Sequence, residues 1–477
     1  MKIGIIGAGP AGISCAYQLA QKNIEVDLYE ADSVVGGMAK TIELWNQKVD
    51  LGPHRFFSSD PRVNQLWLDV IGDDYEMVNR LTRIYYKNKF FYYPLKPFDV
   101  LSKLSYLGIL KGILSYGKEK LFPTEQDGTF ETWVIKRFGQ YLFDCFFKTY
   151  TEKLWGISCA ELDADFAAQR IKKLSMYEAV KTSLVGNRNH KHRTLLDQFA
   201  YPKHGTGEIY YKMAECIQKN KGRIFLSTPV LKVIKKGNTA VAIETIDSRI
   251  KFYDHIVSTM PISDVVGGFS DVPPEVSEAT KTLRYRNTIL VYLRVKQALY
   301  FPDNWLYIHS PDLLMGRLTN FKNWVPAICN GQSDTILALE YWCFDSDSLW
   351  TMDDDKLIHM ANLEMEKTGL LGNGKISDGY VRRIHRSYPV YYKGYKSRLK
   401  KIEDYLDTIK NLTLIGRNGT FKYNNQDHSI LMGILAAENI AAGKAHNLWD
   451  INTDYEYQEK YAVTETGFKT QRDCNNT

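Results

Sequence analysis

Cysteine is scarce in this sequence, and long apolar runs are absent. Seven cysteines are spread over 477 residues, with no Cys-x-x-Cys pair and an odd total. This pattern argues against a disulfide-stapled miniprotein or a zinc ribbon and favours a reducing compartment, so we expect a cytoplasmic protein. No apolar run reaches the roughly 18 residues of a membrane-spanning helix, so no membrane span is expected. The apolar N-terminus carries several glycines, which a nucleotide-binding turn explains better than a signal peptide does.

The sequence also has no strong excess of positive or negative charge. The 61 Lys and Arg outnumber the 55 Asp and Glu by only enough to give a formal charge of +6. That excess is too small to indicate nucleic acid, but it suits an anionic small ligand. No cluster of His and Cys has metal-ligand spacing, so no metal site is predicted. Tyrosine, in contrast, is plentiful at 31 residues, and its ring can stack while its hydroxyl donates a hydrogen bond.

The order of sequence patterns predicts an α/β protein. An apolar run at 2–6, a helix at 10–22 and an alternating strand at 24–30 form a β-turn-α-β unit. An aromatic-rich hairpin is predicted at 83–94, turning at 87–89. The remaining predicted elements are helices at 98–117, 129–148, 163–174 and 176–184, strands within 222–260 and 288–345, helices near 354–368 and 397–410, a strand at 412–415 and a helix at 428–442.

The turn after the first strand matches a dinucleotide fingerprint. Gly7-Ala-Gly9-Pro-Ala-Gly12 has the spacing G-x-G-x-x-G, directly after a strand and directly before a helix. The glycines allow a tight turn, close approach of a pyrophosphate and packing of helix on strand. Glu30 ends the second strand, where a carboxylate can bind ribose hydroxyls. Strand, helix, spacing and acid together predict a bound dinucleotide.

Two further segments favour FAD over a nicotinamide dinucleotide. Residues 31–37, which end in Gly36-Gly37, form an extension common in FAD proteins. Residues 414–417, followed by Asp427, resemble the second flavin-contact region of that superfamily. The predicted cofactor-binding residues are Gly7, Gly9, Pro10, Ala11, Gly12, Glu30, Gly37, Gly416, Arg417, Asp427 and Ser429.

We therefore predict a Rossmann-like FAD-binding domain assembled from discontinuous segments. An inserted helical domain and a mostly antiparallel β-sheet substrate domain complete the predicted fold. The predicted boundaries are 1–82, 206–265 and 405–445 for the FAD-binding domain, 83–94, 196–205 and 266–404 for the substrate domain, 95–195 for the helical domain and 446–477 for a C-terminal tail.

Several motifs, in order, resemble the UDP-galactopyranose mutase family, particularly its longer eukaryotic form. The most selective are YTEKLWG at 150–156 and the segment from Arg417 through Tyr423 to NQDHS at 425–429. The segment LGPHRFF at 51–57 resembles the histidine loop that packs on the flavin. The remaining matches are Arg170, Trp305-Leu-Tyr307, Gly316-Arg317 and Tyr388-Pro389.

The resemblance implies a set of site residues. A nucleoside diphosphate needs cationic donors, and Arg binds phosphate with two parallel hydrogen bonds. The implied catalytic residues are Arg170, Arg317, Arg417 and His54. The implied substrate-binding residues are Tyr150, Trp155, Tyr307, Tyr388, Tyr423 and Asn425.

The resemblance also implies an isomerase whose chemistry resides in the cofactor. UDP-galactopyranose, or a related nucleotide sugar, would be converted to the furanose through an adduct between reduced flavin N5 and the sugar. NAD(P)H is the implied reductant, and a homo-oligomer is compatible with the sequence. The rival interpretation is a flavin oxidase or dehydrogenase of the amine oxidase or protoporphyrinogen oxidase type. A flavin-bearing scaffold without catalysis is the third.

Local alternatives accompany several of these assignments. His54 could be a packed loop histidine, Tyr150 and Trp155 could belong to the core, and Arg170 could form a surface salt bridge. His428 could cap the last helix, and the acidic run 353–355 is expected to cap the helix that follows it. The sequence departs from the family at Pro53, at Phe57 and in the short segment between Tyr423 and Asn425. These departures bear on the identity of the sugar and on the mobility of the histidine loop.

Overall fold

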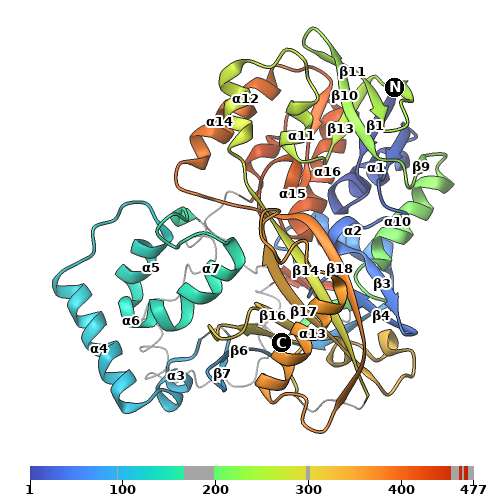
Figure 1. Cartoon of the computed structure of the whole chain (residues 1–477). Coiled ribbons are helices and arrows are strands. Elements are labelled where there is room, and N and C mark those ends of the chain that lie inside the picture. Colours follow the sequence, from blue (N-terminus) through green and yellow to red (C-terminus); the bar gives the residue numbers. More distant parts are fainter. Residues whose placement is uncertain (94, 166–197, 297–300, 453–460, 465–466, 471–477) are drawn as a thin grey trace.

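The computed structural model describes residues 1–93, 95–165, 198–296, 301–452, 461–464 and 467–470. Three of the predictions lie outside the described residues: Arg170, most of the helix at 163–174 and the whole helix at 176–184. Figure 1 shows three regions: a parallel sheet flanked by α1 and α16, a large sheet below it, and a group of helices that projects to one side. This is the predicted α/β architecture with a Rossmann-like part and a substrate-domain sheet. The exact predicted boundaries between the domains stay predictions.

The Rossmann-like sheet joins strands that are far apart in the sequence. Its order is β19-β13-β1-β2-β9, and each neighbouring pair of strands is parallel. α1 packs on α16 so closely that a Cβ on Gly433 would lie 2.5 Å from the Ala11 carbonyl oxygen. The bounds are β1 Lys2–Ile6, α1 Pro10–Gln21, β2 Glu25–Tyr29, β9 Arg223–Phe225, β13 His255–Ser258, β19 Leu412–Leu414, α15 Gly416–Gly419 and α16 Gln426–Ala442.

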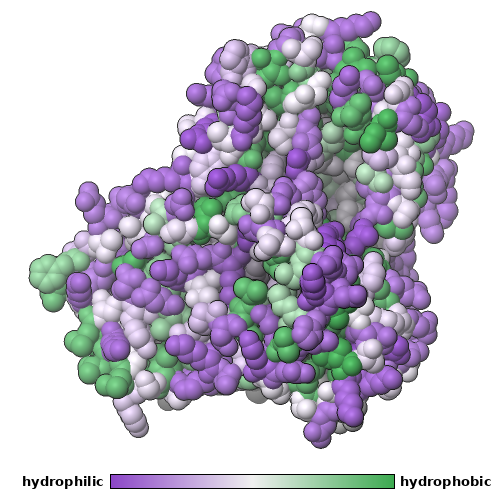
Figure 2. Space-filling model, in the orientation of Figure 1, coloured by the Kyte–Doolittle hydropathy of each residue, from purple (hydrophilic) through white to green (hydrophobic). Residues whose placement is uncertain are grey.

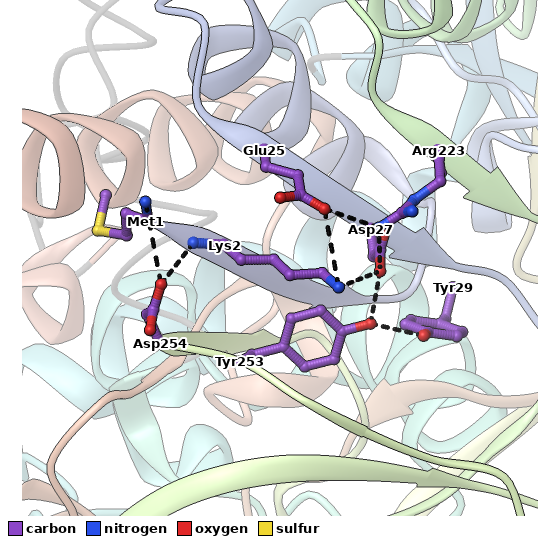
Figure 3. Close-up of polar contacts among 8 residues, drawn as sticks. All are labelled: Met1, Lys2, Glu25, Asp27, Tyr29, Arg223, Tyr253 and Asp254. Carbon is purple, nitrogen blue, oxygen red and sulfur yellow. Dashed lines mark hydrogen bonds and ion pairs between the residues drawn. The ribbon is translucent and has the colours of Figure 1, made fainter.

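A polar network ties this sheet together away from its glycine turn. Asp27, fully buried in β2, accepts hydrogen bonds from Arg223 Nε at 2.6 Å and from the Tyr253 hydroxyl at 2.8 Å. Lys2 Nζ lies 3.8 Å away, and the Tyr29 hydroxyl bonds to that of Tyr253 at 2.6 Å (Figure 3). Because its partners are all in place, we interpret this cluster as structural: it fastens β9 and the segment before β13 to β2.

The large sheet has the order β18-β14-β17-β16-β15-β6-β7 and is antiparallel except between β15 and β6. Both faces of its central strands are buried: Ile289 and Val291 pack toward α13, whereas Leu290 and Tyr292 pack toward β4. The bounds are β6 Thr82–Tyr86, β7 Lys89–Tyr92, β14 Tyr285–Lys296, β15 Trp305–Ile308, β16 Arg317–Asn320, 3-10 turns Phe321–Asn323 and Pro326–Cys329, β17 Thr335–Cys343, α13 Asp354–Thr368 and β18 Lys375–Pro389.

The helical region is more broken than its periodicity predicts. The predicted helix at 98–117 is two helices, because Leu104 has an extended backbone and Ser105 caps the second one. The predicted helix at 129–148 ends first at Gly139, where φ is +79°, and finishes in a π-helical turn. The bounds are α3 Pro97–Lys103, α4 Tyr106–Leu121, α5 Phe130–Phe138, α6 Gln140–Phe143, the π turn Asp144–Lys148 and α7 Thr149–Trp155.

Smaller elements complete the described chain. The hairpin predicted at 83–94 is present as β6 and β7, with Lys87 and Asn88 in the left-handed region that a two-residue turn requires. None of the described helices is long and apolar enough to cross a membrane. The remaining bounds are a 3-10 turn Gly37–Ala39, β3 Thr41–Leu44, β4 Gln47–Asp50, α2 Pro61–Ile71, β5 Tyr75–Asn79, β8 Gln198–Pro202, α10 Glu208–Lys219, β10 Val230–Lys236, β11 Thr239–Thr245, β12 Ile250–Phe252, α11 Ile262–Gly267, α12 Pro274–Lys281, α14 Tyr395–Asp407, a 3-10 turn Leu448–Asp450, β20 Tyr461–Thr464 and β21 Gly467–Thr470.

Candidate functional site

Two glycines of the turn between β1 and α1 have no room for a side chain. A Cβ on Gly7, whose φ is +91°, would lie 2.0 Å from Thr259 Oγ1, and one on Gly12 would lie 2.0 Å from the Gly7 carbonyl oxygen. Gly9 is the N-cap of α1 and makes no side-chain cap bond to the first N–H groups of the helix. The turn presents backbone donors and the positive end of a helix, as a bound pyrophosphate requires.

Glu30 is fixed at the end of β2 beside this turn. Its carboxylate accepts hydrogen bonds from the backbone N–H of Ala8 at 2.7 Å and of Asp32 at 2.9 Å. Each bond occupies a different oxygen, so each oxygen keeps acceptor capacity for a ligand hydroxyl. The position and the chemistry both suit ribose hydroxyls.

A cavity of about 740 Å³ runs from the glycine turn to the start of α16. Its volume falls in the range of roughly 300–1,000 Å³ that is typical of small-molecule and cofactor sites. Gly12 lies beneath the turn and Asp427 is buried inside α16, so neither is part of the lining. The predicted residues that do line the cavity are Gly7, Gly9, Pro10, Ala11, Glu30, Gly37, His54, Gly416, Arg417, Asn425 and Ser429.

The cavity also has walls that the sequence alone did not suggest. Thr259 follows β13, and Arg382 reaches from β18 to pair with Asp32 at 2.9 Å. Lys40 pairs with the same carboxylate, so Asp32 connects the nucleotide-binding loop to the large sheet. Residues at 382–385 carried no recognisable motif and could be found only from the fold.

These residues fit a bound FAD. The glycine turn presents backbone donors to a pyrophosphate, Glu30 keeps acceptor capacity for ribose hydroxyls, and the N-termini of α1 and α16 both open on the cavity. Among the described residues, no group of three or more His, Cys, Asp and Glu is placed to hold a metal ion.

His54 lies on the loop that faces the far end of the cavity. Its Nε2 lies 3.2 Å from the Leu51 carbonyl oxygen, and Gln426 Nε2 donates to the carbonyls of His54 and Arg55. Burial, followed by the positive charge of Arg417, lowers the pKa of His54 to about 4. At neutral pH this imidazole is therefore uncharged.

Arg417 stands between the cavity and a cluster of aromatic rings. Its Nε and Nη2 donate to the Asn424 carbonyl oxygen at 2.9 and 2.7 Å, and its Nη1 donates to the Ser387 carbonyl oxygen at 2.8 Å. The guanidinium lies 5.2 Å from the Tyr388 ring centre and 5.1 Å from that of Tyr423. Nη1 also donates to Met38 Sδ at 3.9 Å. These four contacts fix its position, and one N–H group remains for a ligand because a guanidinium has five.

We call this cluster of rings the aromatic box: Tyr150, Trp155, Tyr307, Trp342, Tyr388 and Tyr423. Tyr388 stacks on Tyr423 at 5.3 Å, and Trp155 meets both edge-on. Tyr150 meets Tyr307 and Trp342 edge-on at 5.5 and 5.8 Å. The structure thus brings together all five aromatic residues predicted to bind substrate, from four separate stretches of chain.

Arg317 places a buried positive charge in the aromatic box. Its guanidinium lies 5.9 Å from the Tyr307 ring centre and 5.6 Å from that of Trp342, and its Nη1 lies 3.3 Å from Glu340 Oε1. Although burial opposes the charge, Glu340 and the surrounding tyrosines hold the pKa of Arg317 well above its usual value. Its buried Nε makes no hydrogen bond to any residue in the described part of the chain.

The supports of Arg317 explain parts of two motifs. Trp342 packs against Gly316, where a Cβ would lie 1.9 Å from the ring. Lys153, within YTEKLWG, donates its Nζ to the carbonyls of Ile308, Ser310 and Met315 and so holds the loop that leads to β16. The Lys in this motif therefore holds the loop through three backbone carbonyls.

Two predictions about α16 have different outcomes. Asn425 is its N-cap: the Asn425 side chain accepts from the backbone of His428, and His428 Nδ1 accepts from the Asn425 N–H at 3.2 Å. The capping role expected as an alternative for His428 is therefore confirmed. The substrate contact predicted for Asn425 stays a prediction, although its side chain is already engaged. At α13, Asp353 occupies the N-cap position without a side-chain cap bond.

Glu340, Trp342 and His309 were missed by sequence reasoning. Glu340 and Trp342 belong to the continuous apolar strand β17, and His309 stacks on Tyr150 at 4.8 Å. An acid inside an otherwise apolar strand was the available signal, because a buried carboxylate needs a partner.

Comparison with known proteins identifies the fold and the wider family. Residues 10–372 match the model of the flavin containing amine oxidoreductases. The coproporphyrinogen III oxidase of Staphylococcus aureus is 22% identical over 92% of this chain and 99% of its own length. A probable UDP-galactopyranose mutase of Klebsiella pneumoniae is 26% identical over 34% of this chain and 43% of its own. A crystal structure of reduced UDP-galactopyranose mutase superposes with a TM-score of 0.84 at 21% identity, covering 95% of this chain and 98% of that one.

Proposed function

The chain belongs to the flavin containing amine oxidoreductase family, and within it we propose an FAD-dependent nucleotide-sugar mutase. It would interconvert the pyranose and furanose forms of a nucleotide sugar, with UDP-galactopyranose as the first substrate to test. The observation that carries the proposal is the buried cation Arg317 inside the aromatic box, next to the cofactor cavity. Aromatic rings placed around a cation have the chemistry to bind a sugar and an anionic diphosphate.

The glycine turn, Glu30 and the start of α16 would hold the FAD. When bound and reduced, the isoalloxazine supplies the nucleophile for the anomeric carbon, so no side chain need act as one. His54, neutral at physiological pH, would pack beside the ring system without adding charge. NAD(P)H is the proposed reductant, and the proposed location is the cytoplasm.

Arg417 and Arg317 would both bind the diphosphate, each through different N–H groups. Arg417 is held by backbone carbonyls and offers its remaining N–H group from a fixed position. Arg317 offers its Nε, and the diphosphate would add negative charge to that already supplied by Glu340. Because burial raises the pKa of Tyr388 to about 12, its hydroxyl stays protonated and can donate to a phosphate or sugar oxygen. Arg170 is proposed as a third cation.

A second candidate function rests on the coproporphyrinogen III oxidases. Relatives with that name in Staphylococcus aureus and Bacillus subtilis align over 92% and 84% of this chain, each at 22% identity. An oxidase would use the same FAD cavity, but it would consume oxygen and leave an oxidised product. The two candidates therefore differ in whether net oxidation accompanies turnover.

Product analysis with UDP-galactose tests the proposal. The enzyme reduced with dithionite should form UDP-galactofuranose, separated by chromatography, while the oxidised enzyme should not. Arg317→Ala should reduce the rate by at least about tenfold, because a charge-assisted bond contributes about 1.5–3 kcal/mol. Arg294→Ala is the matched control. Arg294 lies on β14 of the same large sheet as Arg317, but it pairs with Asp334 outside the aromatic box. If no furanose forms, and coproporphyrinogen is oxidised with uptake of oxygen, the mutase proposal is wrong.

A further inference from the structure

The outer face of α4, together with its C-cap residue Phe122, carries an apolar strip. We define the α4 strip as Tyr106, Leu107, Leu110, Ile113, Leu114, Leu121 and Phe122, whose relative exposures range from 52% to 93%. Phe98 and Leu101 of α3 extend it, at 59% and 44% exposure. Hydrophobic side chains gather at the margin of the molecule where α4 runs (Figures 1 and 2). Contiguous exposed apolar surface of this kind marks an interaction site more often than it marks bare surface.

The inner face of α4 explains why its large apolar residues point outward. A Cβ on Gly108 would lie 2.7 Å from the Tyr141 hydroxyl, and one on Gly112 would lie 3.6 Å from the same ring. Ser115 accepts a hydrogen bond from the Tyr141 backbone N–H at 3.0 Å. The helix therefore packs on Tyr141 through Gly108, Gly112 and Ser115, with a side chain sterically excluded at Gly108, and displays its leucines and isoleucines outward.

Lysines border the strip on both sides. At 100° per residue, Lys111 and Lys118 lie along one edge of the strip and Lys120 along the other. All three side chains are exposed. Glu119, the only acid within 105–122, is turned inward, where it accepts hydrogen bonds from the backbone N–H and hydroxyl of Thr124. The outward face of α4 is therefore purely apolar and cationic.

We propose that the α4 strip docks the protein on an anionic lipid surface. An apolar helix face bordered by lysines lies in a bilayer interface, with the apolar side chains among the acyl chains and the ammonium groups at the phosphates. Each lysine near an anionic surface adds to the attraction. A second copy is a poorer occupant, because a two-fold contact between α4 helices would set lysine borders against each other with no outward acid to pair them.

Vesicle co-sedimentation of the full-length holoenzyme tests this proposal. The protein should sediment with vesicles of phosphatidylcholine and phosphatidylglycerol, and much less with phosphatidylcholine alone. Added salt should weaken the binding, because exposed charges are screened. Ile113→Glu/Leu114→Glu should lower the partition coefficient by about tenfold or more, and Lys111→Gln/Lys118→Gln should lower it by several-fold.

Matched variants separate the strip from general effects. Ile246→Glu/Phe252→Glu changes two exposed apolar residues elsewhere to the same acid, and Lys219→Gln/Lys236→Gln removes two exposed lysines off the strip. Both controls should sediment like the native protein, and all variants should keep their flavin and melting temperature. The proposal is overturned if the native protein ignores anionic vesicles. It is equally overturned if Ile113→Glu/Leu114→Glu binds them undiminished, or if that variant instead dissociates a dimer that does not bind vesicles.

Discussion

Replacing Glu340 by Gln tests whether the buried cation in the aromatic box depends on its counter-ion. Arg317 and Glu340 are register partners on β16 and β17, and their side chains are 13% and 3% exposed. Removal of one member of a buried pair costs about 3–5 kcal/mol, because the other charge stays uncompensated. The contact is 3.3 Å and an amide can still accept a hydrogen bond, so we expect a loss near the lower limit, about 3 kcal/mol.

Thermal unfolding of the holoenzyme measures this loss. At roughly 1–2 °C per kcal/mol for a chain of this size, the midpoint of Glu340→Gln should fall by about 3–6 °C. Glu278→Gln is the control, because its pair with Lys281 is exposed and should matter little. UDP should raise the midpoint of Glu340→Gln more than that of the native protein, because a diphosphate supplies the missing anion. The reasoning would be refuted if Glu340→Gln and Glu278→Gln had the same melting midpoint. It would also be refuted if UDP raised the midpoints of Glu340→Gln and the native protein equally.

Three further outcomes can be checked. Gly12→Ala should yield protein without flavin, seen in the visible spectrum, because its Cβ would lie 2.0 Å from the Gly7 carbonyl oxygen; a normal yellow protein would contradict this. Burial and the charge of Lys153 lower the pKa of His309 to about 3. The unfolded chain therefore binds a proton that the folded protein does not, and the native protein loses stability as the pH falls from about 6.5 toward 3. Thermal melts across that pH range should show a smaller loss of stability for His309→Phe. Lys153→Met should slow furanose formation by about tenfold with flavin content unchanged, since three loop carbonyls lose their donor, and full activity would exclude that role.

The nucleotide-binding end of the site could be predicted from sequence because it is local. The turn at 7–12, its helix and Glu30 lie within one β-α-β unit, where spacing alone fixes the geometry. The helix predicted near 354–368 and the strand near 412–415 were recovered to within a residue for the same reason. Long periodic segments and short-range turns carry their own signals.

The partner of Arg317 could not be predicted, because it depends on strand register. Arg317 and Glu340 meet only if β16 and β17 pair in one particular alignment, which no local signal sets. The sequence also could not predict which face of α4 packs inward. Periodicity at 98–117 indicates an apolar face but not which face is buried, and here Tyr141 selects the glycine face. The role of Arg170 stays a prediction.

The distribution of the cavity walls along the chain has a consequence for biosynthesis. The cavity takes residues from 7–54 near the start of the chain, but also from 382–385 and 416–429. At about 5–20 residues per second, a ribosome finishes the last wall roughly 20–80 s after the first. Strand β1 likewise cannot pair with β13 until β13 has been synthesised, and β13 cannot pair with β19 until still later. The nascent chain therefore cannot complete this cavity until almost all of it has been made, so the full set of cofactor contacts forms late in folding.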